Sequence, residues 1–214
     1  MQKIADIETT DLKALRRKLL PIEGKASEFY FKQMFQLLPA PMQKTDKRRG
    51  FHAYDGLNNT FNLTYSLLSW KVHRALLDSK LEPFLGFMHS EQPYKPSLVC
   101  DVMELYRHLA DDFIIQYSKK IKRADFVQKT EKYTANRIGK REYLSDTKSN
   151  DLMCRFYAFL DWHVRIPQIR HGNRSTIKTL IGEESSILAS YLRNEKKERV
   201  PRVGITNSSD SQRY

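Results

Sequence analysis

The sequence is poor in cysteine, glycine and proline, and it has no long apolar run. Two cysteines, Cys100 and Cys154, are too few for a disulfide framework or for a zinc site built on cysteine pairs. Eight glycines and eight prolines exclude a collagen-like or low-complexity chain. No apolar segment approaches the ~18 residues of a membrane span, and residues 1–10 lack the apolar stretch of a signal peptide. We therefore expect a cytoplasmic protein with free thiols and no membrane span.

The sequence does contain enough apolar residues for a core, and a large excess of positive charge. Of its 214 residues, 40% are hydrophobic and 11% are aromatic, which suits one domain of ordinary size. The 37 lysines and arginines exceed the 25 acidic residues, giving a net charge of +12. A surplus of this size favours a polyanionic partner, most commonly nucleic acid, although ribosomal, membrane-surface and heparin-type partners share the signature. The charge is densest in residues 119–141, which hold nine basic and two acidic side chains.

Apolar residues recur at helical spacing nearly everywhere, with no convincing strand and no internal repeat. One stripe comprises Ile22, Ala26, Phe29, Met34 and Leu37. A second comprises Leu57, Phe61, Tyr65, Leu68, Val72 and Ala75. A third helix opens at Pro96–Ser97 with the stripe Leu98, Val102, Leu105, Leu109 and Phe113, and segments 142–160 and 174–192 give two more. We predict an all-α, bundle-like single domain over 21–203, preceded by a helical segment over 1–20 and followed by a polar, disordered tail over 204–214.

Four side chains suggest a metal site. Glu23 lies near the start of the first long predicted helix, His89 follows an apolar loop, and Asp101 and Glu104 have the i, i+3 spacing that places both carboxylates on one helix face. Each has an ordinary alternative: a helix cap, a structural histidine or a solvated acidic face. The acidic pair lies within apolar sequence, however, and a buried carboxylate pair needs a cation or a shared proton. Together these donors suit one Mg²⁺ or Mn²⁺ ion, and on a basic protein such an ion indicates phosphodiester chemistry.

Several sequence blocks occur in a characteristic order. They are IEGKA (22–26), YDGLN running on to YSLL (54–68), LEPFLGFMH (81–89), SLVCDVME (97–104) and IGEE with the following helix (181–192). In this order they resemble the helical catalytic domain of the CRISPR adaptation integrases, the enzymes that insert new spacers into CRISPR arrays. The resemblance covers roughly residues 20–200, and the blocks are specific together although each alone is a weak signal.

The resemblance implies a metal-dependent DNA integrase and endonuclease of a prokaryotic cytoplasm. The family's divalent-metal ligands correspond here to Glu23, His89 and Glu104, and Asp101 matches an acid that supports the site. The 3′-hydroxyl end of a short DNA fragment would attack a phosphodiester at a CRISPR repeat boundary by transesterification, assisted by Mg²⁺ or Mn²⁺. No covalent protein–DNA intermediate is needed, so no tyrosine is expected to act as a nucleophile.

Basic residues near the sequence blocks are candidates for contacts with the DNA backbone, with a solvated surface charge as the alternative. They are Lys25, Arg48, Arg49 and Lys95. Three aromatic residues are expected to belong to the core rather than to stack on bases, namely Tyr54, Tyr65 and Trp70. The expected partners are therefore a DNA fragment and the CRISPR repeat with its leader, and no membrane.

The sequence departs from the family at its N-terminus. Family members usually begin with a β-rich domain that pairs the subunits, whereas only about twenty residues precede Glu23 here. We expect a compact variant like those of type V-C systems, acting as a homo-oligomer, most simply a tetramer, without a required companion subunit; a truncated piece of a longer protein is the alternative. Two further interpretations stay open, a transposon-encoded integrase of the same fold and a non-catalytic DNA-binding subunit.

Overall fold

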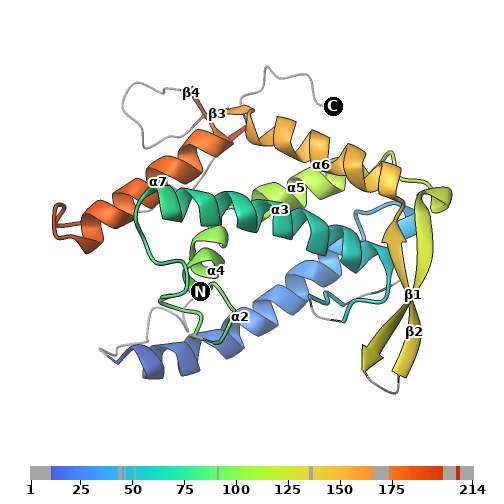
Figure 1. Cartoon of the computed structure of the whole chain (residues 1–214), viewed down its shortest axis with the longest axis horizontal. Coiled ribbons are helices and arrows are strands. Elements are labelled where there is room, and N and C mark those ends of the chain that lie inside the picture. The colour runs from blue at the N-terminus through green and yellow to red at the C-terminus, as the bar shows by residue number, and fades with distance from the viewer. Residues whose placement is uncertain are drawn as a thin grey trace.

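The computed structural model describes residues 11–42, 45, 47–50, 52–90, 92–134, 137–165, 174–199 and 206–207. Helices dominate this part of the chain, and two small sheets lie at its edges (Figure 1). None of the described helices is long and apolar enough to cross a lipid bilayer. Residues 1–10 of the predicted leading segment and nearly all of the predicted tail 204–214 lie outside the described residues.

The elements follow one another as α2 (Leu12–Phe35), the 3₁₀ helix η1 (Ala40–Met42), α3 (Gly56–Asp78), α4 (Ser97–Met103), α5 (Arg107–Ser118), the 3₁₀ helix η2 (Arg123–Asp125), β1 (Phe126–Thr134), β2 (Arg137–Leu144), α6 (Asp146–Leu160), β3 (His163–Arg165), β4 (Arg174–Thr176), α7 (Ile177–Leu192) and β5 (Thr206–Asn207). Helix α3 is central, because α4, α5, α6, α7 and β2 all pack against it. The predicted helical character is thus confirmed in outline.

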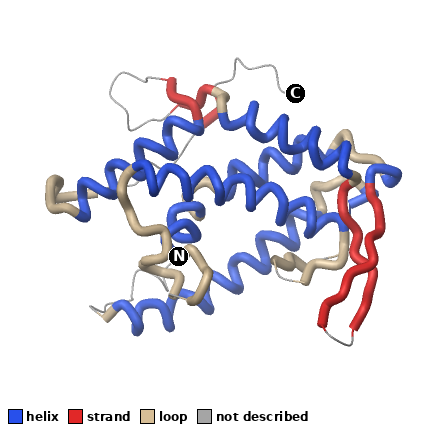
Figure 2. The backbone as a smooth tube through the Cα atoms, in the orientation of Figure 1, coloured by secondary structure: helices blue, strands red, loops and turns tan. Residues whose placement is uncertain are grey.

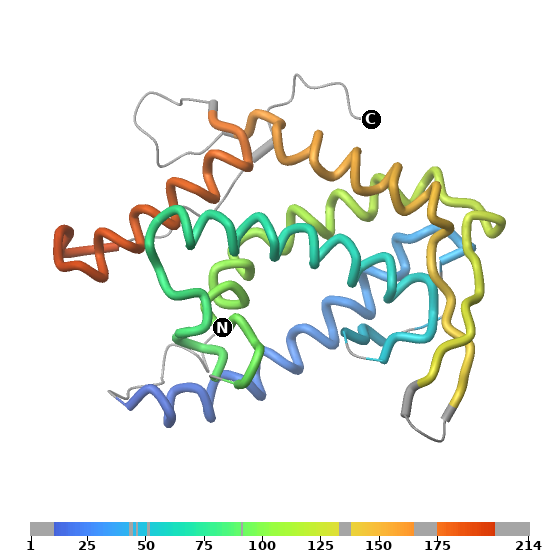
Figure 3. The backbone as a smooth tube through the Cα atoms, in the orientation of Figure 1, coloured from blue at the N-terminus to red at the C-terminus, as the bar shows by residue number. Residues whose placement is uncertain are grey.

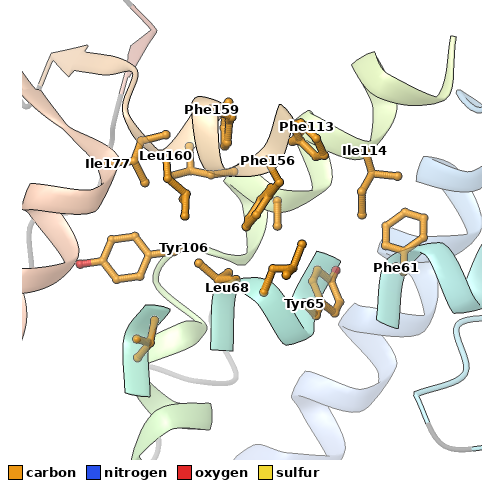
Figure 4. Close-up of a cluster of buried hydrophobic side chains, with 14 of the residues drawn as sticks. Phe61, Tyr65, Leu68, Tyr106, Phe113, Ile114, Phe156, Phe159, Leu160 and Ile177 are labelled. Carbon is orange, nitrogen blue, oxygen red and sulfur yellow. The ribbon is translucent and has the colours of Figure 1, made fainter. Parts of the chain in front are cut away.

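The core is built around α3. Asp55 begins this helix by accepting a hydrogen bond from the backbone N–H of Asn58 at 2.7 Å, which satisfies one of the free donors at a helix start. All six apolar positions of the predicted second stripe are buried, as expected. Figure 4 shows aromatic and aliphatic side chains from α3, α5 and α6 gathered in one apolar cluster.

Helix α2 is continuous over 24 residues, although the sequence places a boundary between residues 20 and 21. Pro21 lies inside the helix, and Asp11 caps its start by accepting hydrogen bonds from the backbone N–H groups of Lys13 and Ala14. Glu23 therefore lies in the middle of a long helix, not in a first helical turn. Its carboxylate cannot act as the N-terminal cap that was its structural alternative.

The predicted apolar stripe of this helix is wrong at most of its positions, although Met34 is buried as predicted. Phe29 and Leu37 are 68% and 67% exposed, and the buried residues of α2 are Phe31, Met34 and Phe35. Only the last turns of the helix enter the core, so apolar residues before them recur at helical spacing without a core to face.

The predicted third helix is two helices. Helix α4 ends at Met103 and α5 begins at Arg107, and between them the backbone N–H groups of Leu105 and Tyr106 donate to carbonyls three residues back, at 3.2 and 2.9 Å, instead of four. The interruption directs the Tyr106 ring, which is 1% exposed, into the core (Figure 4). Leu105, expected on the buried stripe, is only half-buried as a result.

The prediction that the chain contains no strand is wrong. Strands β1 and β2 form an antiparallel hairpin, largely from the basic segment 119–141, in a register that opposes Phe126 to Leu144. The hairpin projects beside the helices (Figure 2). Most of its middle is polar on both faces, so it lacks the alternation of apolar and polar residues that identifies a half-buried strand. The β-branched residues Val127 and Thr130 were the remaining signal.

A second small sheet has the order β4-β3-β5, with both pairs antiparallel. It shortens a predicted helix, because residues 174–176 form β4 and α7 begins only at Ile177. Helix α6 likewise begins at Asp146 rather than at residue 142, since β2 continues to Leu144.

Candidate functional site

Asp101 on α4 holds the loop that carries His89. Its carboxylate accepts hydrogen bonds from the backbone N–H groups of Phe87, of Met88 at 3.0 Å and of His89 at 2.9 Å. A fourth contact joins it to Nδ1 of the His89 ring at 2.6 Å. Burial disfavours the charged carboxylate, but the hydrogen bonds outweigh burial and lower the pKa of Asp101.

The contact with Asp101 fixes the orientation of the His89 imidazole. An ionised carboxylate only accepts hydrogen bonds, so Nδ1 carries the proton between the two groups and Nε2 is the nitrogen left to bind a ligand. Metal-binding histidines commonly use this arrangement. Of the sequence-predicted site residues, His89 and Asp101 are thus in direct contact.

The His89 loop is also held by a close backbone approach and by α2. A Cβ atom on Gly86 would lie 2.7 Å from the backbone carbon of Ser97 and 2.9 Å from an Asp101 carboxylate oxygen, so a larger side chain requires a shift. Arg16 donates from Nε to the carbonyl of Phe87 at 2.7 Å and from Nη2 to the carbonyl of Gly86 at 3.1 Å. Figure 3 shows this loop beside the first half of α2. Neither constraint is apparent from the sequence alone.

Glu23 and His89 line one cavity of about 470 Å³. Helix α2 supplies Glu23, and the loop held by Asp101 supplies His89. Arg48 and Arg107 line the same cavity, so guanidinium groups and predicted ligands share its wall. Glu28, less than two turns further along α2, adds a carboxylate that the sequence analysis did not single out.

The third predicted ligand, Glu104, is paired with Arg107. Glu104 Oε1 lies 2.6 Å from Arg107 Nη1. Among the residues that the structure describes, no three histidine, cysteine, aspartate or glutamate side chains are arranged to hold a metal ion. Glu104 is nevertheless linked to the cavity of Glu23 and His89, because its partner Arg107 lines that cavity. The three-residue ligand set stays a prediction.

A buried acid, Asp111 of α5, belongs to the same region. It is 3% exposed and accepts hydrogen bonds from the hydroxyls of Tyr65 and Tyr30, the latter at 2.9 Å. Burial raises the pKa of Asp111, against the opposing effects of the tyrosine hydroxyls and of the arginine charges nearby. The Arg107 guanidinium lies 4.9 Å from the centre of the Tyr65 ring. No local pattern predicts this network, because its members meet only in the fold.

Arg48, a predicted DNA contact, is built into the cavity wall. Its guanidinium lies 5.1 Å from the ring centre of Tyr65 and 5.7 Å from that of Phe61. It donates hydrogen bonds to the side-chain oxygens of Asn58 at 3.2 Å and of Asn62 at 2.7 Å. Burial lowers its pKa. The charge is therefore held in one position, unlike that of a free surface arginine.

The other predicted DNA contacts, Lys25, Arg49 and Lys95, are not among the residues that line this cavity. Lys25 and Arg49 are exposed. Lys25 is two residues from Glu23, and residues at that spacing do not share a helix face. Lys95 is half-buried, and its carbonyl accepts a hydrogen bond from the Ser97 hydroxyl at 3.3 Å. Their contacts with DNA stay predictions.

The three aromatic residues expected in the core differ in their burial. Tyr65 is 8% exposed, as predicted, whereas Tyr54 is 38% exposed and packs against Arg141. Trp70 is 70% exposed, so its assignment to the core is wrong. Trp70 therefore lies on a face of α3 that is exposed in the part of the chain that the structure describes.

Some of the basic residues in segment 119–141 form ion pairs in the hairpin region. Lys129 lies 3.1 Å from Asp146, and Arg141 lies 3.3 Å from Glu131. Arg123 pairs with the buried Glu142 at 2.5 Å. Local acids thus offset part of the charge that the sequence alone assigns to this segment.

Comparison with known proteins shows the family to which the chain belongs. The family model described as "CRISPR associated protein Cas1" matches residues 1–149, and the chain belongs to this family. The resemblance inferred from the sequence blocks is thereby confirmed.

Curated relatives support the same assignment. A CRISPR-associated endonuclease Cas1 of Korarchaeum cryptofilum is 24% identical over 95% of this chain and 55% of its own length. Another, from Methanospirillum hungatei, is 30% identical over 71% of this chain and 41% of its own length. The chain thus spans about half the length of these relatives.

Solved structures share the fold. A casposase bound to its integration product superposes with a TM-score of 0.74 at 24% identity, over 92% of this chain and 52% of that one. The Cas1 protein of Thermotoga maritima superposes with a TM-score of 0.68 at 19% identity, over 87% of this chain and 54% of that one. At these identities the likeness concerns the fold alone.

Proposed function

We propose that this chain carries the catalytic domain of a CRISPR adaptation integrase of a prokaryotic cytoplasm, which joins 3′-hydroxyl ends of short DNA fragments to CRISPR repeat boundaries by transesterification. The observation that best supports this is a histidine held by Asp101 and facing the same cavity as Glu23, in a chain of the Cas1 family. The net charge of +12 would attract the DNA.

A divalent ion suits the donors of this site. Glu23, His89 and Glu104 would hold one Mg²⁺ or Mn²⁺ ion, since two carboxylates and an imidazole are ligands that these ions accept. When bound, the ion would polarise a phosphoryl oxygen and favour ionisation of the attacking hydroxyl. Asp101 prepares the site by keeping Nε2 of His89 in place. To bind the ion, Glu104 would give up its ion pair with Arg107.

Two arginines would bind the reacting phosphate. Arg48 and Arg107 line the cavity, and both guanidinium groups pack on the ring of Tyr65. A cation fixed in this way stabilises negative charge that builds up on a phosphate without having to reorganise first. In this scheme Arg107 would bind phosphate once Glu104 is released from it.

Strand transfer into a supercoiled plasmid that bears a CRISPR repeat tests the proposal. Transfer should require Mg²⁺ or Mn²⁺ and stop when the ion is chelated. His89→Ala should abolish transfer and leave DNA binding nearly unchanged, because binding is distributed over many basic residues. His73→Ala is the matched control, since this histidine packs edge-to-face on Phe84 and should keep its activity. Loss of DNA binding together with transfer in His89→Ala would contradict the assigned role.

DNA affinity should depend steeply on salt. Each phosphate contact on a duplex contributes a log–log slope of about −0.9, through release of counterions. Titrations between low and physiological salt measure this slope. A slope of zero would contradict an electrostatic DNA surface.

The working form is proposed to be a homo-oligomer, most simply a tetramer, for which no companion subunit is required. Insertion of a fragment needs two strand-transfer events related by a dyad, and two-fold symmetry supplies two sites. A domain of this fold is also part of the solved Cas6-RT-Cas1–Cas2 complex, which superposes with a TM-score of 0.69. Light scattering with and without branched DNA measures the assembly; a monomer in the active complex would rule it out.

A second candidate is a transposon-encoded integrase of the same fold. The superposition on a casposase favours keeping it. Insertion that is equally frequent in plasmids with and without a CRISPR repeat would support this alternative. A non-catalytic subunit, by contrast, would bind DNA and show no metal-dependent transfer.

A further inference from the structure

Asp111 is a buried acid to which the proposed reaction assigns no role. It lies on α5, about one turn after Arg107, and is 3% exposed. One carboxylate oxygen accepts a hydrogen bond from the Tyr65 hydroxyl, and the other accepts one from the Tyr30 hydroxyl at 2.9 Å. Because burying a charge is costly, an apolar residue here would often be at least as stabilising. Stability alone therefore does not explain the acid.

The ring of Tyr65 connects Asp111 to both arginines of the cavity wall. The guanidinium groups of Arg107 and Arg48 lie 4.9 and 5.1 Å from its centre. The ring itself is held edge-to-face on Phe61, with the ring centres 5.9 Å apart. The face of an aromatic ring attracts cations, and a hydroxyl that donates to a carboxylate is polarised by it. One side chain thus transmits the effect of Asp111 to two guanidinium groups.

The charge of Asp111 also opposes the repulsion between the two arginines. Burial lowers the pKa of Arg48, the neighbouring Arg107 charge lowers it further, and the Asp111 charge opposes both effects. In the proposed reaction Glu104 gives up its ion pair with Arg107 to bind the ion. Asp111 would keep a negative charge in the network at that moment.

We propose that Asp111 is a positioning residue that, through the Tyr65 hydroxyl, holds the two arginines of the cavity wall where a phosphate would meet them. Cations that are already in place stabilise charge on a phosphate without first reorganising. Asp111 is buried and itself touches no DNA in this scheme. The inference rests on the proposed function, because it assigns a residue to the preparation of that site.

Two variants break the connection in different ways. Asp111→Asn removes the charge and keeps the shape, whereas Tyr65→Phe removes the hydroxyl and keeps the ring. Each should slow strand transfer at saturating DNA by roughly 10–100-fold, because a small displacement of groups that position the reacting phosphate has effects of this size. The Kd for DNA should stay unchanged, since binding is distributed over many basic residues. The double variant should be no slower than the slower single variant, because both substitutions break one contact.

Tyr117→Phe is the matched control. Tyr117 is also buried on α5, and its hydroxyl donates to the Asp151 carboxylate at 2.9 Å. Its loss should lower stability about as much as Tyr65→Phe does and leave strand transfer unchanged. An equal slowing of transfer in Tyr117→Phe would mean that lost stability explains the effect, and would overturn the positioning role. If Asp111→Asn does not fold, Tyr65→Phe and this control still decide the question.

Nuclear magnetic resonance gives a readout that does not depend on catalysis. The Nε–H signal of Arg107, identified by its loss in Arg107→Lys, should exchange faster with water in Asp111→Asn and in Tyr65→Phe, and stay unchanged in Tyr117→Phe. Unchanged signals and transfer rates in the first two variants would overturn the positioning role while leaving the proposed reaction intact. Faster exchange in those variants of a chain that shows no strand transfer would support the role and overturn the proposed reaction.

Discussion

Helices α2 and α3 are nearly equal in length, with 24 and 23 residues, but they serve different purposes. Twelve residues of α3 are buried, against three of α2. Figure 3 shows α2 running along the outside of the other helices. The exposed length of α2 instead carries Glu23 into the cavity and Arg16 onto the His89 loop.

The comparison shows when an apolar stripe identifies a core face. In α3 every turn is covered by another element, so the stripe and the buried face coincide. In α2 the fully buried residues among those that the structure describes lie in the last turns, so Phe29 stands at a helical position with its ring exposed. Two helices with similar sequence periodicity can therefore serve different ends. The residues of one helix pack the core, and those of the other position the candidate site.

The largest expected contrast is in stability. Phe61→Ala on α3 should lower the free energy of unfolding by about 3–5 kcal/mol, because a fully buried ring is lost and a cavity remains. Phe29→Ala on α2 should change it by less than about 0.5 kcal/mol, because the ring is already exposed to solvent. Urea denaturation of both variants measures the contrast. Similar losses in the two variants would mean that a partner covers α2.

Two glycines sharpen the comparison. Gly86→Ala should cost about 1–3 kcal/mol of stability, because its Cβ would press on Ser97 and Asp101. It should also reduce strand transfer, since the His89 loop must shift. Gly24→Ala in α2 meets nothing within 4 Å and should instead raise stability by about 0.5–1 kcal/mol. Thermal unfolding and transfer assays on both variants decide this; a harmless Gly86→Ala would contradict the tight loop.

Loss of the hydrogen bonds between α2 and the His89 loop should have a smaller effect on stability. Arg16→Ala removes the charge-assisted hydrogen bonds to the Phe87 and Gly86 carbonyls and should cost about 1–2 kcal/mol. Strand transfer should weaken as the loop loosens, with faster hydrogen exchange at its amides. The adjacent exposed Arg17 provides the control, Arg17→Ala, for which no change is expected. An unchanged exchange rate in Arg16→Ala would show that Asp101 alone holds the loop.

The two helix caps give the smallest expected contrast. Asp11→Ala should cost about 0.5–1 kcal/mol, because the capped end of α2 is exposed and frays locally. Asp55→Ala should cost up to about 2 kcal/mol, since its carboxylate also accepts a hydrogen bond from the Asn58 side chain at 3.0 Å. Denaturation measures the free energy of unfolding of both variants. Equal losses would contradict the expectation that removal of the cap destabilises the buried helix α3 more than the exposed helix α2.

The sequence sufficed for elements that pack along their whole length. The stripe from Leu57 to Ala75 was predicted correctly because local spacing and core contact agree. The hairpin was missed because most of its middle is polar on both faces, which removes the period-2 signal there. The helix break before Arg107 was missed because it accompanies the burial of Tyr106, which depends on the packing of the surrounding core.

The candidate site was predictable only as a set of residue types. Residue spacing and the family resemblance predicted Glu23, His89, Asp101 and Glu104 as site residues. In the structure, His89 and Asp101 are in direct contact. The contacts around these residues join distant segments: Arg16 reaches the His89 loop, and in the neighbouring network Tyr30 reaches Asp111. A single sequence carries no local pattern for such contacts, because they depend on how the helices pack.

The buried carboxylate of Glu142 fixes one end of the hairpin to the start of α3. It accepts a hydrogen bond from the Gly56 N–H at the start of α3 and pairs with Arg123 below β1. At about 3.3 Å per residue, the nine residues of β1 make an arm of roughly 30 Å fixed at its root. A rotation of about 5° at the start of α3 would thus move the far end of that arm by roughly 2–3 Å. A spectroscopic label at the exposed Ile138 would magnify small rearrangements of the central helix into a measurable displacement.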